Sequence, residues 1–137
     1  MIKIVYGPKG FGKTKIMLDE VNKAGENAKG NVVFISDKRF NTASINLNVR
    51  CLYTEEYKIT SSQAFTGFVN GLLAGNSDIE YVFIDGLKRI IGSELRGGQA
   101  LFKSLKALNK AYPELKIVVS VSATKEDLPK YIAKYVK

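Results

Sequence analysis

Four short apolar runs, separated by stretches with helical periodicity, constrain the fold of this 137-residue chain most strongly. The runs comprise residues 2–6, 31–36, 81–85 and 116–121. They are rich in β-branched and aromatic residues and nearly continuous in apolar character, which is typical of parallel strands covered on both faces. A fifth run, Val49–Tyr53, is a candidate for an additional strand.

The stretches between these runs predict four helices. The first spans residues 14–23, and the third spans residues 99–111. The second follows a capping box formed by Thr60 and Gln63, with apolar residues at helical spacing behind it. The last begins near Asp127. Because strands and helices alternate, we expect a three-layer α/β/α sandwich around a mostly parallel sheet of four to five strands.

Two glycines lie inside the second predicted helix, at Gly67 and Gly71. Each weakens a helix by about 1 kcal/mol relative to alanine. We therefore expect this helix to pack closely against a neighbour at these positions. A chain of 137 residues is long enough for one hydrophobic core, so we expect one domain, residues 1–137.

The charge balance points to a polyanionic partner. The chain has 21 Lys and Arg against 13 Asp and Glu, a net charge of +8. This fits a nucleotide, a nucleic acid or an acidic lipid surface, although lysines on solvated helix faces would give the same balance. With no His and one Cys, zinc, haem and iron–sulfur sites and His-dependent catalysis are effectively excluded.

No apolar run approaches the roughly 18 residues of a membrane-spanning helix. The apolar start of the chain leads directly into a glycine-rich turn, without the apolar region of a signal peptide. We therefore expect a cytoplasmic protein with no membrane span.

The glycine-rich turn matches the pattern G-x-x-x-x-G-K-[ST] at every fixed position, with Gly7, Gly12, Lys13 and Thr14. Glycines permit positive φ and let successive backbone N–H groups surround a phosphate with no Cβ in the way. The helix that follows points the positive end of its dipole at the same anion. With an apolar strand before it and a helix after it, the turn predicts a phosphate-binding loop.

Two side chains of this loop suit a nucleoside triphosphate with magnesium. Lys13 is a flexible cation able to reach the β- and γ-phosphates, and Thr14 offers a hydroxyl to Mg²⁺, which prefers oxygen ligands. We therefore expect ATP or another nucleoside triphosphate, and Mg²⁺, as cofactors. The predicted nucleotide-binding residues are Gly7, Pro8, Lys9, Gly10, Phe11, Gly12, Lys13, Thr14 and Lys15.

A carboxylate ends the third apolar run. Four apolar residues lead to Asp85, the form of a Walker B strand. An Asp at the end of a buried strand would lie beside the phosphate loop and hold Mg²⁺, so Thr14 and Asp85 are the predicted metal residues. Alone, such an Asp would more simply cap the turn before Gly86.

These two motifs and the order of elements make the chain resemble the P-loop NTPases, and within them the RecA-like group. The resemblance covers essentially the whole chain, although only the phosphate-loop motif is highly specific. The guanine-reading motif Asn-Lys-x-Asp of GTPases is absent, since the nearest match, at residues 109–112, ends in Tyr. The RecA-like resemblance implies that run 116–121 lies between runs 2–6 and 81–85. In the kinase–GTPase branch, the last two would instead be direct neighbours.

The compact length and the end of the third run also resemble small stand-alone P-loop proteins that are labelled twitching-motility or secretion-type ATPases. The true motor ATPases carry a His-rich motif, and this chain has no His. We therefore do not carry the motor function over.

The RecA-like resemblance implies two further groups near the γ-phosphate. One is a carboxylate that activates water, commonly a Glu directly after the Walker B Asp. Here that position is Gly86, so Asp37 is the best substitute and Glu94 the second. The other is a polar residue at the end of the strand after Walker B, for which Ser120 and Ser122 are the candidates. A plain hydroxyl cap explains either serine equally well.

The predicted catalytic residues are accordingly Lys13, Asp37 and Ser122. A positively charged loop side chain of this chain, or of a neighbouring chain, could also contact the γ-phosphate. For any single one of these side chains, a plain solvent-exposed position is the simpler interpretation. These cations are Lys38, Arg39, Lys88, Arg89 and Arg96. The irregular segment 37–48 would border such a site, because ligands of α/β sheets bind beyond the carboxyl ends of the strands.

Three functions fit these residues. The preferred one is an ATP- and Mg²⁺-binding P-loop protein with slow hydrolysis, accelerated by a protein partner or by self-assembly into a homo-oligomer. The first alternative is a small-molecule phosphotransferase, with Asp37 as base and residues 92–98 as a lid that carries Arg96. The second is a nucleic-acid-associated module that uses surface lysines. These are Lys103, Lys106, Lys110, Lys130, Lys134 and Lys137.

Overall fold

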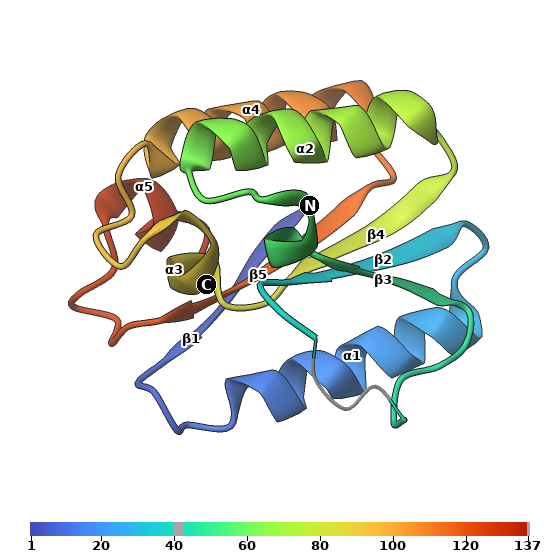
Figure 1. The fold of residues 1–137 in the computed structure, drawn as a ribbon, viewed down its shortest axis with the longest axis horizontal. Helices are drawn as coiled ribbons and strands as arrows, with labels where there is room; N and C mark the ends of the chain where they lie inside the picture. The colour runs from blue at the N-terminus through green and yellow to red at the C-terminus, as the bar shows by residue number, and fades with distance from the viewer. Residues whose placement is uncertain (40–42, 137) are drawn as a thin grey trace.

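A five-stranded parallel sheet forms the centre of the protein in the computed structural model, which describes residues 1–39 and 43–136 (Figure 1). The strands are β1 (Ile2–Gly7), β2 (Asn31–Ser36), β3 (Val49–Tyr53), β4 (Ile79–Ile84) and β5 (Lys116–Ser122). Every neighbouring pair of strands is parallel. The α/β class, the mostly parallel sheet and the additional strand at Val49–Tyr53 are thus confirmed.

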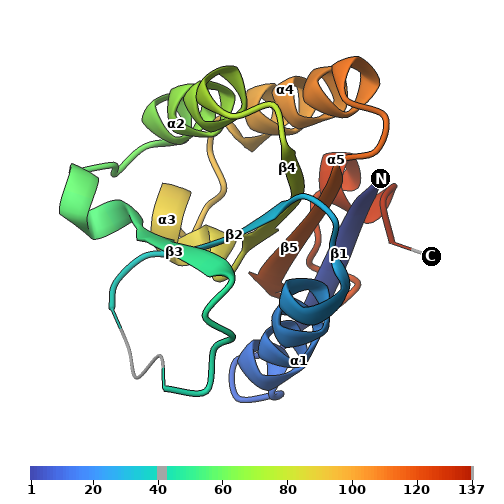
Figure 2. The ribbon, with the colours of Figure 1, turned by 90° about the vertical axis from the view of Figure 1, so that its right-hand side faces the viewer.

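Helices cover both faces of the sheet unequally. One face carries α1 alone, and the helices α2 to α5 lie on the other, which gives three layers (Figures 1 and 2). The helices are α1 (Lys13–Asn27), α2 (Ser62–Gly75), α3 (Leu87–Ile91), α4 (Gly98–Ala111) and α5 (Lys130–Ala133), with a 3₁₀ turn at Thr54–Tyr57. In the described part of the chain, none of these helices is long and apolar enough to cross a membrane.

Side chains that alternate along each strand build two separate cores. Phe34 and Phe83 face α1 and pack around Met17, whereas Ile35 and Ile84 belong to the core beneath the other helices. A strand covered on both faces needs apolar residues at nearly every position. This is why the runs in the sequence show no polar alternation.

The strand order is β1-β5-β4-β2-β3, so β5 lies between β1 and β4 as predicted. The register places Gly7 of β1 opposite Ser122 of β5, and Val119 of β5 opposite Ile84 of β4. The carboxyl ends of these three strands therefore meet at one edge of the sheet. The loop between β1 and α1 begins there, and Asp85 directly follows β4 at the same edge.

Three details of the helices differ from the sequence predictions. The N-cap of α2 is Ser61, whose hydroxyl accepts a hydrogen bond from the Ala64 amide at 3.1 Å, so the capping box at Thr60 is wrong. The last helix begins at Lys130 rather than near Asp127. Helix α3 was not predicted, because five residues are too few for helical periodicity to show.

The expectation of close packing at Gly67 and Gly71 is also wrong. A Cβ added at either glycine meets no atom within 4 Å, so both positions face open space. Helix α2 instead contacts α4 along another face, where the Asn70 side-chain amide donates to the Ser104 hydroxyl at 2.7 Å. These glycines therefore cost helix stability without a compensating contact.

Substitutions in α2 test this assignment of faces. Phe65 is fully buried, so Phe65→Ala should lower the free energy of unfolding by about 3–5 kcal/mol. Gly67→Ala should raise it by about 0.5–1 kcal/mol, because alanine favours the helix and meets no neighbour. Urea denaturation measures both. A destabilising Gly67→Ala would show that this face of α2 is covered.

Candidate functional site

The loop between β1 and α1 adopts a backbone conformation that requires glycine. Gly10 has φ 87° and Gly12 has φ 83°, and Gly12 is the N-cap of α1. Side chains with a Cβ rarely adopt these values, so the glycines of the sequence motif coincide with the turns that need them. The loop is anchored within itself by the Phe11 amide, which donates to the Pro8 carbonyl at 3.1 Å.

Most backbone amides of this loop remain available. The first α1 bond is donated by Ile16 to the Gly12 carbonyl at 3.1 Å, so the preceding amides of the first turn have no partner within the helix. Unpaired N–H groups at a helix start, together with the helix dipole, favour an anion. The loop amides without an acceptor among the described residues are those of Lys9, Gly10, Gly12, Lys13, Thr14 and Lys15.

Lys13 points back into the loop. The residue is only 8% exposed, and its ammonium donates to the Pro8 carbonyl at 2.9 Å. Burial lowers the pKa of Lys13 below its ordinary value; Asp85 opposes this shift, and the cations of Arg89 and Lys88 add to it. One hydrogen bond to a neutral carbonyl replaces little of the hydration that this nearly buried ammonium has lost. An anion in the loop would therefore stabilise its positive charge.

Asp85 joins the loop to the sheet. The residue is 4% exposed, and its two carboxylate oxygens have different partners. Oδ1 accepts a hydrogen bond from the Ser120 hydroxyl at 2.8 Å, and Oδ2 faces the Thr14 hydroxyl at 3.4 Å. The Ser120 hydroxyl also accepts from the Gly86 amide at 2.7 Å. The predicted metal residues Thr14 and Asp85 thus lie together.

A cavity of about 340 Å³ opens between the loop and the ends of β4 and β5. Asp85 is its only carboxylate among the described residues. The cavity is lined by Lys9, Gly10, Gly12, Lys13, Thr14, Asp85, Arg89, Ser120 and Ser122. Four other residues predicted to bind nucleotide do not line the cavity: Gly7, Pro8, Phe11 and Lys15. Phe11 is 61% exposed.

The two candidate serines of β5 have different surroundings. Ser120 is buried and holds Asp85, whereas Ser122 lies opposite Gly7 and lines the cavity. Ser122 is the more accessible of the two to a ligand in the cavity. Ser120 instead orients the carboxylate beside it.

Arg89 of α3 reaches over the end of β4. Its Nε lies 3.1 Å from Asp37 Oδ1, and its Nη2 lies 3.6 Å from Asp85 Oδ2. The guanidinium also covers Gly86, where an added Cβ would come within 2.2 Å of Nη2. Gly86 has φ 78°, so a side chain there is disfavoured for a second reason. Sequence reasoning included Arg89 among five loop cations but had no signal to select it.

The remaining predicted catalytic groups lie outside the cavity. Asp37 follows β2, and within the described part of the chain its side chain reaches the residues lining the cavity through Arg89. Glu94 pairs with Arg96 at 2.6 Å, and both are exposed beside a separate depression near the end of α3. Of segment 37–48, residues 40–42 lie outside the described part of the chain, and none of its described residues lines the cavity.

The residues present fit a magnesium ion that is coordinated mostly by phosphate oxygens and water and by few protein oxygens. Among the described residues, no three acidic, His or Cys side chains form a metal-binding group. Mg²⁺ commonly uses one or two protein oxygens and completes its shell with waters and phosphate oxygens. The Thr14 hydroxyl and the Asp85 carboxylate beside the unpaired loop amides match that pattern.

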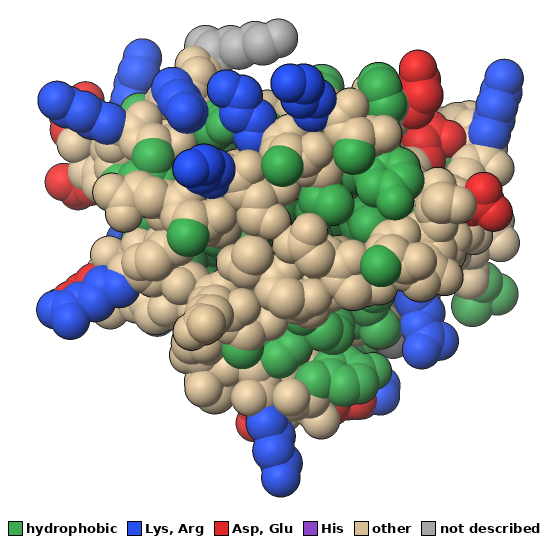
Figure 3. Space-filling view, turned by 90° about the horizontal axis from the view of Figure 1, so that it is seen from above, with side chains coloured by type: hydrophobic (Ala, Val, Ile, Leu, Met, Phe, Trp, Pro, Cys, Tyr) green, Lys and Arg blue, Asp and Glu red, His purple; other side chains and the backbone are tan. Residues whose placement is uncertain are grey.

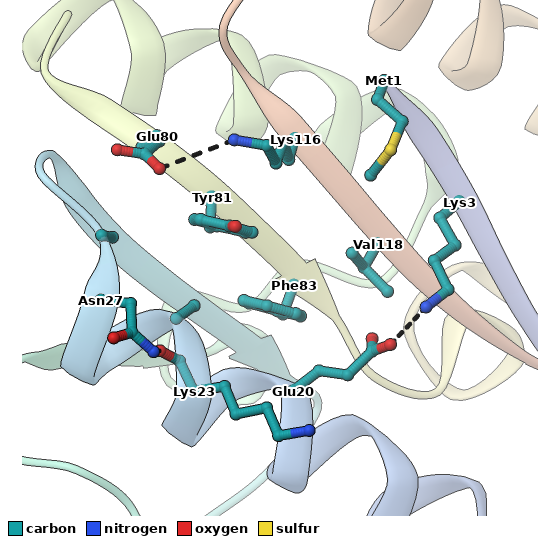
Figure 4. Close-up of a pocket in the computed structure, with 12 residues that line it drawn as sticks. Met1, Lys3, Glu20, Lys23, Asn27, Glu80, Tyr81, Phe83, Lys116 and Val118 are labelled. Atoms are coloured by element: carbon teal, nitrogen blue, oxygen red, sulfur yellow. Dashed lines mark hydrogen bonds and ion pairs between the residues drawn. The ribbon is translucent and has the colours of Figure 1, made fainter.

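A second depression, of about 300 Å³, lies beside α1 at the opposite ends of the strands (Figure 4). Its two glutamates are already paired, Glu20 with Lys3 and Glu80 with Lys116. Its floor is formed by the rings of Tyr81 and Phe83, whose centroids are 5.6 Å apart. None of the described residues that line this depression belongs to the loop between β1 and α1, so the unpaired amides of that loop do not face it.

The described lysines considered for nucleic-acid binding lie on or beside α4 and α5, and none of them lines the cavity. Basic side chains lie along one side of the face made by α2 and α4, and α2 itself has no charged residue (Figure 3). Among the described residues, the largely exposed aromatic residues are Phe11 and Tyr57, which lie on other elements. Of the lysines predicted for nucleic-acid binding, Lys103, Lys106, Lys110, Lys130 and Lys134 are exposed, and Lys137 lies outside the described residues.

Comparison with models of known protein families gives no match, and comparison with curated proteins gives none. The interpretation of the site therefore depends on its own geometry.

The different roles of Ser120 and Ser122 can be tested by measuring how each contributes to the stability of the protein. Ser120→Ala should lower the free energy of unfolding by about 1–3 kcal/mol, because it leaves the Gly86 amide and one oxygen of Asp85 buried without this partner. Ser122→Ala, the matched control on the same strand, should change it by less than about 0.5 kcal/mol. Urea denaturation compares them. Equal effects would refute the role given to Ser120.

Proposed function

We propose that this chain is a P-loop protein of the RecA-like type that binds a nucleoside triphosphate with Mg²⁺ and hydrolyses it slowly. The observation that carries the proposal is the meeting of three groups at one cavity. The unpaired loop amides, the Lys13 ammonium and the Thr14–Asp85 pair all lie at the carboxyl ends of adjacent strands. In α/β sheets, ligands bind at this edge.

Each group has a distinct task in this proposal. The loop amides and Lys13 would hold the phosphates, and Thr14 and Asp85 would hold the metal ion, directly or through water. When bound, Mg²⁺ would neutralise charge on the phosphate oxygens. Ser120 keeps the carboxylate of Asp85 oriented toward Thr14. Ser122 is within the cavity and is available to a phosphate.

The strand order supports the RecA-like type over the kinase–GTPase branch. In that branch the strand before the phosphate loop pairs directly with the strand that ends in the Walker B Asp. Here β5 separates β1 from β4. The short sequence motifs alone do not distinguish the RecA-like type from the kinase–GTPase branch.

The shortage of carboxylates supports slow hydrolysis. A rapid RecA-like hydrolase has a carboxylate positioned to activate water. Among the described residues lining the cavity, Asp85 is the only acidic one, and its oxygens already face Ser120, Thr14 and Arg89. A homo-oligomer or a protein partner would supply the missing group, and both remain proposals. Among the described residues, no largely exposed aromatic ring lies on α4 beside its exposed lysines for base stacking, so nucleic-acid binding is not favoured.

Replacement of Lys13 tests nucleotide binding. Lys13→Ala should weaken the binding of a fluorescent ATP analogue with Mg²⁺ by about tenfold or more, because a charge-assisted contact to phosphate is lost. Lys103→Ala, which removes an exposed lysine of α4, is the control and should bind like the wild type. Equal affinity of the Lys13 variant and the wild type, measured by fluorescence titration, would refute the proposal.

The acceptor of the phosphoryl group separates hydrolysis from phosphotransfer. With γ-labelled ATP and Mg²⁺, we expect slow release of inorganic phosphate and no labelled product when nucleosides or small metabolites are added. Asp37 and Arg96 lie outside the cavity, which leaves a phosphotransferase without its predicted base and lid. A labelled organic product detected by chromatography would instead establish the phosphotransferase.

A further inference from the structure

Arg89 occupies a special position between the two carboxylates that follow β2 and β4. Its Nε lies 3.1 Å from Oδ1 of Asp37, and its Nη2 lies 3.6 Å from Oδ2 of Asp85. Asp37 and Asp85 are 48 residues apart in the sequence, yet one guanidinium connects them. The two contacts are unequal, since the contact to Asp37 is shorter and is a hydrogen bond.

The oxygen that Arg89 approaches on Asp85 is the one that faces Thr14. Oδ1 of Asp85 already accepts from Ser120, whereas Oδ2 lies 3.4 Å from the Thr14 hydroxyl and 3.6 Å from the guanidinium. Under the proposed function, Oδ2 is therefore the oxygen directed at the metal position. Arg89 now provides the positive charge that the metal ion would bring.

Asp37 is held in place to receive this cation. Its backbone carbonyl accepts from the Glu55 amide at 2.8 Å, and its Oδ1 is 3.3 Å from the Ser36 hydroxyl. The guanidinium is free to move, because the Arg89 side chain is 49% exposed. Gly86 beneath it has no side chain to obstruct that movement.

We propose that Arg89 is the resident counter-ion of Asp85, and that Mg²⁺ enters by displacing it toward Asp37. This inference rests on the proposed function and adds its regulation. Two cations at one oxygen repel each other, so metal binding at Asp85 and the Arg89 contact weaken one another. Asp37 makes the displacement easier because it offers the guanidinium a second carboxylate. The strength of the Arg89–Asp37 pair thus sets the Mg²⁺ concentration that the site requires.

The experiment measures the Mg²⁺ concentration that gives half-maximal binding of the fluorescent ATP analogue. Arg89→Met removes the competitor and should lower this concentration, by about threefold for a half-exposed ion pair. Asp37→Asn removes the alternative partner of Arg89 and should raise the same concentration by a similar factor. The double variant should behave like Arg89→Met, because Asp37 has no role here once the guanidinium is gone.

Two controls are matched to these substitutions. Arg50→Met removes an exposed arginine of β3, and Glu114→Gln removes an exposed carboxylate before β5; neither should shift the half-maximal concentration. Urea denaturation of every variant checks that it is folded. Opposite shifts of the two single variants, with the double variant following Arg89→Met, support the inference. Shifts in the same direction, or no shift, overturn it.

The outcomes separate this inference from the function on which it rests. If the wild type binds the analogue with Mg²⁺ and the variants do not shift, the displacement of Arg89 is wrong and the proposed function stands. If the wild type binds no analogue at any Mg²⁺ concentration, the proposed function fails and the inference fails with it.

Discussion

The hydrogen bond from Ser120 to Asp85 holds the carboxylate that faces Thr14 at the start of α1. It depends on the parallel register of β4 and β5, which places Val119 opposite Ile84 and brings the next residue of each strand level. Because Asp85 is nearly buried, its charge requires such partners, and Ser120 also accepts from the Gly86 amide. A shift of either strand by one residue would turn its side chain to the other face and separate the carboxylate from Thr14.

The sequence allowed the strands and the loop to be predicted because their signals are local. Apolar runs marked the strands, and the glycines of the phosphate loop coincide with positive φ at Gly10 and Gly12. The site as a whole was less accessible to prediction. The pair Arg89–Asp37 and the choice of Ser120 over Ser122 as the partner of Asp85 depend on which strands are neighbours and in what register. No local pattern contains that information.

The errors in the helices have a related cause. Periodicity describes which residues share a face but not what that face meets, so the glycines of α2 were assigned to a contact that the structure does not have. Similarly, Thr60 and Ser61 are both able to cap a helix, and the backbone of the preceding turn selects Ser61. The short α3 carries Arg89 to the site, and its five residues gave no periodic signal.

Under the proposed function, the conformation of Gly86 limits how this chain could evolve toward faster hydrolysis. RecA-like hydrolases commonly have a glutamate at this position. Here a glutamate would adopt an unfavourable positive φ, and its Cβ would displace the Arg89 guanidinium. The flexible guanidinium could move aside, but the backbone turn would have to change before a glutamate at position 86 became favourable. The order in which mutations can accumulate is in this way restricted by one turn of the chain.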